Sequence, residues 1–168
     1  MRAQSVLLML LALCACDRQS AAEKARDDAR DVAMVEKAQR QIPPADPLAP
    51  QPITIADVQA NKLAGAGCAF TAKSGEGGDP VLYADGRRAV LKIDGQLVQF
   101  ASDAGSTELP YATREHYVGK SLDLRLRKDG GEGVAAGEEA MRWPGSVTVR
   151  DPWKREVYSE PGTLECGA

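Results

Sequence analysis

The feature of this sequence that most limits its fold is the alternation of apolar and polar residues from Cys68 onward. Leu122, Leu124 and Leu126, for example, alternate with charged residues. Successive side chains of a strand point to opposite faces, so this spacing predicts strands with one face buried and one in water. Runs of this kind, separated by turn residues, predict six or seven strands in about 110 residues. The fold class is therefore mainly β, as a small antiparallel barrel or a sandwich.

Two Asp-Gly dipeptides between apolar runs predict hairpins, at Asp85-Gly86 and Asp94-Gly95. A two-residue loop at the first turn places Leu82 opposite Ala89. The same loop length at the second turn puts four apolar residues on one face: Ala89, Leu91, Val98 and Phe100. The two turns agree on this face, and they predict a meander of three strands: Val81–Tyr83, Arg88–Ile93 and Gln96–Ala101.

Residues 1–15 have the features of an export signal. Arg2 supplies one positive charge, and the apolar run Val6–Leu13 follows it. This run is too short to cross a bilayer as a helix, which takes about 20 apolar residues. It has the size of the apolar region of a signal peptide. The sequence therefore predicts that residues 1–15 are removed on export.

The end of this segment, Leu13-Cys14-Ala15-Cys16, resembles the lipobox of bacterial lipoproteins. The resemblance implies that a cysteine receives a diacylglyceryl group, that the signal is cut off before it, and that the new amino terminus is acylated. Cys16 follows small Ala15, whereas Cys14 follows bulky Leu13, so Cys16 is the expected lipidation site. The alternative is an ordinary secretory signal cut near Ala15, which would leave Cys16 as a free thiol.

The same resemblance implies a location in the cell envelope, held to a membrane by lipid and facing the periplasm. Two or more acyl chains give a stable anchor, whereas one chain binds only marginally. Asp17 resembles the residue that retains lipoproteins at the inner membrane of enteric bacteria, which favours that membrane over the outer one.

Cys68 and Cys166 remain after export and lipidation. Two cysteines in an oxidising compartment are expected to pair, and this disulfide would join the start of the β domain to its end. The alternatives are two buried thiols or a metal pair. The chain has one histidine and no Cys-x-x-Cys motif, so a structural zinc site lacks ligands and no metal site is expected.

The chain divides into segments of different composition. Residues 16–42 form the lipidated terminus and an alanine-rich, charged helical stalk, which is either a solvated spacer or a partner-binding helix. Residues 43–52 are proline-rich and predict an extended linker. Residues 53–168 form the β domain, and Thr54 with an acidic residue three positions later predicts a helix start within it.

The sequence contains little that points to catalysis. The formal net charge is −3, so a nucleic-acid partner has no electrostatic support. His116 is the single histidine, and no Gly-x-Ser-x-Gly motif or phosphate-binding loop accompanies it. We therefore expect a protein that is not an enzyme and needs no cofactor.

Aromatic residues are the remaining candidates for a binding surface. Trp153, Tyr111 and Tyr117 are expected to contribute to it, since tryptophan and tyrosine concentrate at binding hot spots. Trp143 is expected in the core instead. In size, anchor and end-to-end disulfide the chain is loosely similar to lipoprotein inhibitors of c-type lysozyme, which are small β-barrels, but their inhibitory loop motif has no match here.

These observations predict a non-enzymatic envelope lipoprotein whose β domain binds a protein or small ligand. The alternative is a structural or assembly accessory that acts through its stalk. An envelope hydrolase is a third and less favoured alternative.

Overall fold

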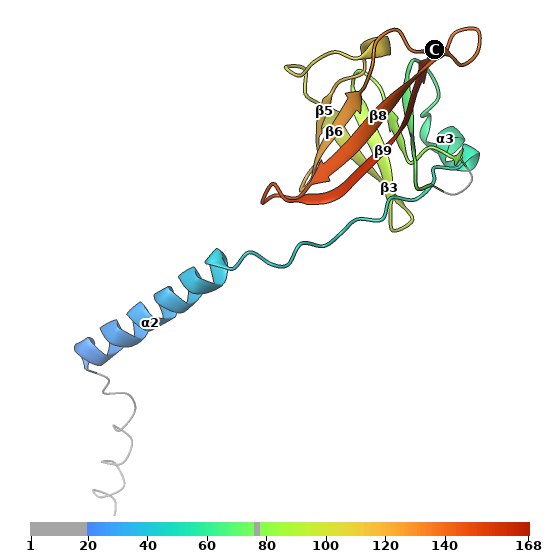
Figure 1. The fold of residues 1–168 in the computed structure, drawn as a ribbon. Coiled ribbons are helices and arrows are strands. Elements are labelled where there is room, and N and C mark those ends of the chain that lie inside the picture. The colour runs from blue at the N-terminus through green and yellow to red at the C-terminus, as the bar shows by residue number, and fades with distance from the viewer. Residues whose placement is uncertain (1–19, 76–77) are drawn as a thin grey trace, which may run out of the picture. The chain divides into compact units, whose positions relative to one another are not determined.

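The computed structural model describes residues 20–75 and 78–168, which belong to two compact units, one up to Pro43 and one from Pro44 on (Figure 1). The predicted signal, Cys14, Cys16 and Asp17 lie outside the described residues. No helix in the described ranges combines the length and the apolar character needed to cross a bilayer.

The first unit contains helix α2, Ala21–Arg40. Its start is a capping box, in which the Ser20 hydroxyl accepts from the backbone of Glu23 and the Glu23 carboxylate accepts from the backbone of Ser20. An ion pair of 2.8 Å between Arg40 and Glu36 supports the last turn. None of the residues of α2 is buried. The helix falls inside segment 16–42, and the role of that segment as a stalk stays a prediction.

The second unit is a closed antiparallel barrel of eight strands, so the structure decides for the barrel over the sandwich. Pairing of β6 with β8 closes the sheet. The short strand β7 (Val134–Ala135) pairs with β8 outside the closed ring. The barrel strands are β1 (Gly67–Ala72), β2 (Leu82–Ala84), β3 (Arg88–Ile93), β4 (Gln96–Ser102), β5 (His116–Val118), β6 (Asp123–Lys128), β8 (Met141–Arg150) and β9 (Glu156–Gly167).

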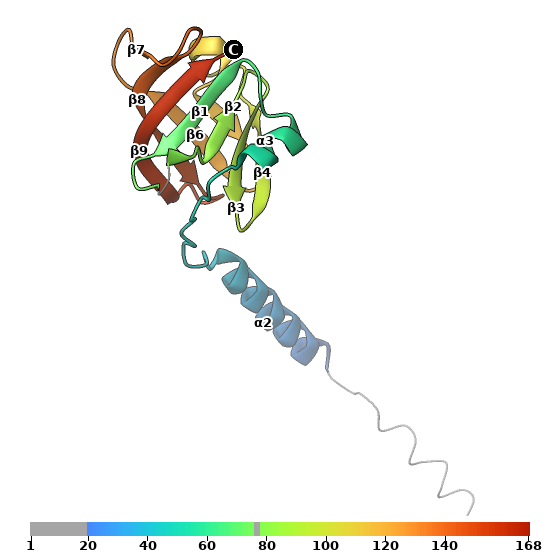
Figure 2. The ribbon, with the colours of Figure 1, turned by 90° about the vertical axis from the view of Figure 1, so that its right-hand side faces the viewer.

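Two short helical segments, α3 and η2, belong to the described part of the barrel unit. Helix α3 (Ile55–Asn61) precedes β1 and lies across the outside of the barrel (Figure 2). A single 3₁₀ turn, η2 (Pro110–Ala112), lies in the long connection between β4 and β5.

The predicted β3–β4 hairpin is confirmed in its register, with Leu91 opposite Val98. Asp94 and Gly95 both have positive φ, as a two-residue hairpin loop of this type requires. The predicted pairing of Leu82 with Ala89 is wrong, because Leu82 lies opposite Leu91. The loop is Gly86-Arg87 rather than Asp85-Gly86, which shifts the register by two residues and so leaves the same side chains facing inward.

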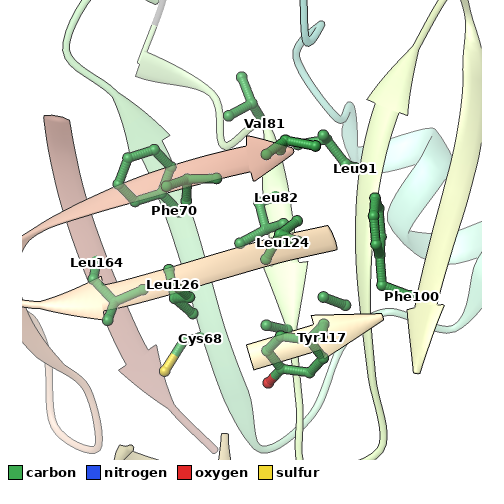
Figure 3. Close-up of a cluster of buried hydrophobic side chains, with 14 of the residues drawn as sticks. Cys68, Phe70, Val81, Leu82, Leu91, Phe100, Tyr117, Leu124, Leu126 and Leu164 are labelled. Carbon is green, nitrogen blue, oxygen red and sulfur yellow. The ribbon is translucent and has the colours of Figure 1, made fainter. Parts of the chain in front are cut away.

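The inward-facing side chains fill the barrel (Figure 3). An eight-stranded barrel has an interior just wide enough for side chains to occupy. Trp143 belongs to this core, as predicted. Its largest fully buried members on the strands include Phe70, Leu82, Leu91, Phe100, Tyr117, Leu124, Leu126 and Leu164.

Two glycines allow the strands around β8 and β9 to approach closely. Gly145 and Gly162 are direct partners in the β8–β9 pair. A Cβ atom at Gly145 would collide with the carbonyl of Arg127 in β6, and one at Gly162 with the carbonyl of Thr71 in β1. Both sites need glycine for steric reasons, and both lie where β8 and β9 meet their outer neighbours.

Part of the proline-rich segment, predicted as an extended linker over residues 43–52, is hydrogen-bonded to the barrel unit. The backbone N–H of Leu48 donates to Val157 O, that of Gln51 to Lys92 O, and that of Ile53 to a carbonyl before β2, each at 2.8 Å. Ile53 is 2% exposed, and Leu48 packs against the core. Apolar residues between the prolines, which sequence composition does not single out, hold this segment to the barrel.

The disulfide between Cys68 and Cys166 is confirmed. The two cysteines face each other directly in the β1–β9 pair and are both buried. They are 98 residues apart in the sequence, so the cross-link closes a loop that includes nearly all of the barrel.

Replacing both Cys68 and Cys166 by alanine should lower the free energy of unfolding by about 4–5 kcal/mol, because the cross-link no longer restricts the unfolded chain. Denaturant unfolding followed by circular dichroism measures the change. A reducing agent should bring the wild type close to the variant and leave the variant unaffected. Equal unfolding midpoints for the oxidised wild type and the variant would contradict the prediction.

Candidate functional site

A hollow of about 290 Å³ lies on the outside of the barrel, between α3 and the strands β1, β2 and β9. Val58 and Leu63 form its wall on the helix side. They cover Val90, which points out of the barrel and is nevertheless 2% exposed. The strand side carries small residues, among them Gly67 and Ala69. A helix packed beside small strand residues leaves this space open.

Helix α3 is held in place by a capping box and an ion pair. The Thr54 hydroxyl accepts from the Asp57 backbone, and the Asp57 carboxylate accepts from the Thr54 backbone at 2.9 Å, so the predicted helix start at Thr54 is confirmed. Asp57 also lies 2.7 Å from Lys92 Nζ on β3. The hydrogen bond from Lys92, together with those from Thr54, lowers the pKa of Asp57 to about 2. This carboxylate therefore stays charged and ties the helix to the barrel.

Besides Asp85, three polar side chains line the hollow. The Arg88 guanidinium donates to the carbonyls of Asn61 and Lys62, at 3.2 and 3.4 Å, at the end of α3. Burial raises the pKa of Tyr83, and the charges of Asp79 and Glu165 raise it further. Tyr83 is therefore a neutral donor at physiological pH. Glu165, the third, is held by Arg142 at 2.6 Å. The hollow thus offers apolar surface with a cation, a phenol and a carboxylate, which suits binding.

His116 lies between two carboxylates at the start of β5. Its Nδ1 is 2.9 Å from Asp103 Oδ2, and its Nε2 is 3.0 Å from Asp123 Oδ1. The second contact lacks the alignment of a hydrogen bond, so we treat it as an electrostatic contact. The hydrogen bond from His116 lowers the pKa of Asp103. Burial raises the pKa of Asp123, but its contacts with His116 and Lys154 outweigh burial and the net shift is downward.

This arrangement is poorly suited to general base catalysis. A catalytic imidazole needs one nitrogen free to take a proton from the nucleophile, and both nitrogens of His116 face carboxylates. The hydroxyl of Ser106 accepts from the backbone N–H of His116 instead of contacting the ring. The cluster connects the β4–β5 loop, β5 and β6, and this is a structural role.

Metal binding has no visible site in the part of the chain that the structure describes. No group of three or more His, Cys, Asp or Glu side chains is placed there to hold an ion.

The three aromatic residues predicted to form one binding surface do not come together. Tyr117 is completely buried, so its assignment to a surface is wrong. Its hydroxyl donates to Asp85 O and accepts from Arg114 N, both at 2.8 Å inside the unit. Period-two alternation on β5 turns this side chain inward, and a strand of three residues is too short for the sequence to reveal that pattern.

Tyr111 and Trp153 are exposed, but at opposite ends of the β8–β9 hairpin. Tyr111 is 37% exposed and donates to Glu139 O, in the loop before β8. Trp153 is 46% exposed in the turn after β8, with the guanidinium of Arg155 5.1 Å from its ring centre. The ten residues of β8 separate the two by about 30 Å. They cannot contribute to one small site.

The hollow beside α3 was missed from the sequence. Its principal polar residues are Tyr83, Arg88 and Glu165, and Glu165 on β9 is distant along the chain from the other two. The signal that was available is Val90, an apolar residue on the outward face of a predicted strand, which indicates that some element covers that face.

The chain belongs to a family described as a domain of unknown function, DUF6692, whose model matches residues 12–146. No curated protein and no solved structure matches it.

Replacing Tyr117 by phenylalanine should lower the free energy of unfolding by about 1–3 kcal/mol, because a part-buried carbonyl and a part-buried N–H lose their partner. The matched control is Tyr111→Phe, which removes an exposed hydroxyl bond and should cost less than about 1 kcal/mol. Denaturant unfolding of the two variants measures both effects. A larger loss for Tyr111→Phe than for Tyr117→Phe would contradict the assignment of Tyr117 to the core.

Proposed function

We propose that this protein is an envelope lipoprotein, anchored by lipid at Cys16, whose barrel is a non-enzymatic module that binds a protein or small ligand in the hollow beside α3. The barrel faces the periplasm, and Asp17 favours the inner membrane. The module uses no cofactor and no nucleic acid.

The observation that supports binding at this place is the contrast between the interior of the barrel and its outer face. Side chains occupy the interior, so a ligand has to bind outside. The hollow combines apolar walls with the polar groups of Tyr83, Arg88 and Glu165. Pockets of this composition orient a ligand by a few polar contacts while burying its apolar part.

The segment before the barrel supports the anchored arrangement. The helix α2 has 20 residues and a length of about 30 Å. Residues 41–47 extend the chain further before Leu48 joins the barrel. As a stalk, this segment would let the hollow reach ligands away from the membrane surface.

A second candidate is an assembly accessory that acts through α2. Val32 and Val35 are 58% and 56% exposed, and residues three apart share one face of a helix. In this case a partner helix covers that face. Deleting residues 20–41 would then abolish function, whereas a binding module keeps its affinity for its ligand. An envelope hydrolase has less support, because both ring nitrogens of His116 face carboxylates.

The anchor can be tested by growing cells that express the full chain with an alkyne-tagged fatty acid. The wild type and Cys14→Ala should carry the label, and Cys16→Ala should lose it. Labelling that depends on Cys14 would assign the anchor to the other cysteine. An unlabelled wild type would favour an ordinary secretory signal.

Binding in the hollow can be tested with a photoreactive phenylalanine analogue at Ala69, which lines the hollow. The matched control places the analogue at Thr148 on β8, which is outside the hollow lining. Irradiated cells should give a covalent adduct at position 69 and none at 148, resolved by gel shift or mass spectrometry. Equal adducts at both positions, or none at 69, would contradict the proposal.

A further inference from the structure

We infer that a second hollow, lined by Arg87, Arg88 and Lys120, binds a phosphate group carried by a small molecule or a lipid headgroup. This hollow has a volume of about 360 Å³ and lies over β3, β4 and β5. It shares only Arg88 with the hollow beside α3, and the inference depends neither on the lipid anchor nor on binding at that other hollow.

The strand register brings the residues together. Arg88 on β3 lies opposite Ala101 on β4, and Ala101 lies opposite Val118 on β5. This row crosses three neighbouring strands on the outer face of the barrel. Lys120 comes two residues after the end of β5, so the hairpin to β6 adds its cation to the hollow.

The three cations have no acidic counterpart. Within the described ranges, no carboxylate lies within ion-pair distance of Arg87, Arg88 or Lys120, and no acidic residue lines the hollow. Seven other basic side chains of the barrel unit each contact a carboxylate, whereas Lys62, Lys73, Arg125 and Lys128 contact none among the described residues; the seven are Lys92, Arg114, Arg127, Arg142, Arg150, Lys154 and Arg155. In a chain with a net charge of −3, three cations without a carboxylate partner around one hollow are a local concentration of positive charge.

The carboxylate in the adjoining turn is already engaged. Asp85 Oδ1 accepts from the backbone N–H groups of Arg87 and Arg88, at 2.7 and 2.8 Å. It belongs to the lining of the other hollow. Asp85 therefore shapes the turn that presents the two arginines and does not occupy the space between the cations.

The arginines are presented on an ordered backbone. Arg87 O accepts from Ser102 N at 3.0 Å, which fixes the turn to the end of β4. The Arg88 guanidinium is held by two carbonyls at the end of α3, and these use only part of its five N–H donors. A guanidinium held by neutral acceptors keeps its charge available for an anion.

The number of cations favours phosphate over a carboxylate. A phosphate carries up to two charges and several acceptor oxygens, and arginine binds it through paired N–H donors. Val118 is 49% exposed beside the cations. An apolar side chain there can contact the organic part of a phosphate ester.

The test uses the chain of residues 20–168. Because α2 buries no residue and the barrel unit has its own core and disulfide, this chain keeps the contacts of the barrel. Inorganic phosphate is titrated at low ionic strength and followed by amide NMR shifts. A parallel sedimentation assay uses phosphatidylcholine vesicles with and without phosphatidylglycerol.

Phosphate should shift the amide resonances of Arg87, of Arg88 and of residues 118–120. Arg87→Gln with Lys120→Gln should weaken binding about tenfold or more, as the loss of hydrogen bonds to a charged group implies. The control, Arg125→Gln with Arg127→Gln, removes the same charge from the exposed face of β6 and should stay within about twofold.

Binding of free phosphate without sedimentation on phosphatidylglycerol vesicles would assign the site to small phosphate compounds, and the reverse would assign it to headgroups. Both results support the inference if the double variant abolishes them. Equal losses in the two double variants, or no response to either probe, would overturn it.

Discussion

The pairing of β6 with β8 is the interaction on which the rest of the structure depends. Without it the strands would form an open sheet with two edges exposed to other chains. The pair runs from Asp123 opposite Arg150 to Lys128 opposite Gly145. Gly145 and Gly162 make the closure possible, because a side chain at either position would collide with a neighbouring strand. Closure then determines which side chains fill the interior and which face outward.

Because the interior is full, any binding by the barrel unit has to use its outer face. Helix α3 produces one hollow by covering Val90 while leaving the small residues of β1 uncovered. The other hollow lies over β3, β4 and β5, and Arg88 lines both hollows. The disulfide joins β1 to β9. Backbone hydrogen bonds attach the segment from Leu48 to Ile53 to the barrel. Both hollows therefore lie on strands and turns that are held firmly.

Much of the β structure followed from local patterns. The Asp94-Gly95 turn specified its register, because positive φ at both positions allows only a tight loop. The Asp85-Gly86 turn did not, because the Asp85 carboxylate accepts from the backbone N–H groups of Arg87 and Arg88, and the loop moves by one residue. The predicted inward face of each strand is nevertheless correct, because the pairing is shifted by two residues and side chains alternate with a period of two. The pairing of Cys68 with Cys166 was predictable from the cysteine count and the expected compartment.

The sequence by itself determined the strands, their inward faces and the disulfide, because alternation, turn residues and cysteine pairing depend on near neighbours or on composition. It also contains the lipobox-like segment, on which the proposed location in the cell envelope depends. Only the tertiary structure decided that the sheet closes, that Tyr117 lies inside, and that Arg87, Arg88 and Lys120 meet without a carboxylate. Those outcomes depend on which distant strands pair and in what register, and a linear pattern does not contain that information.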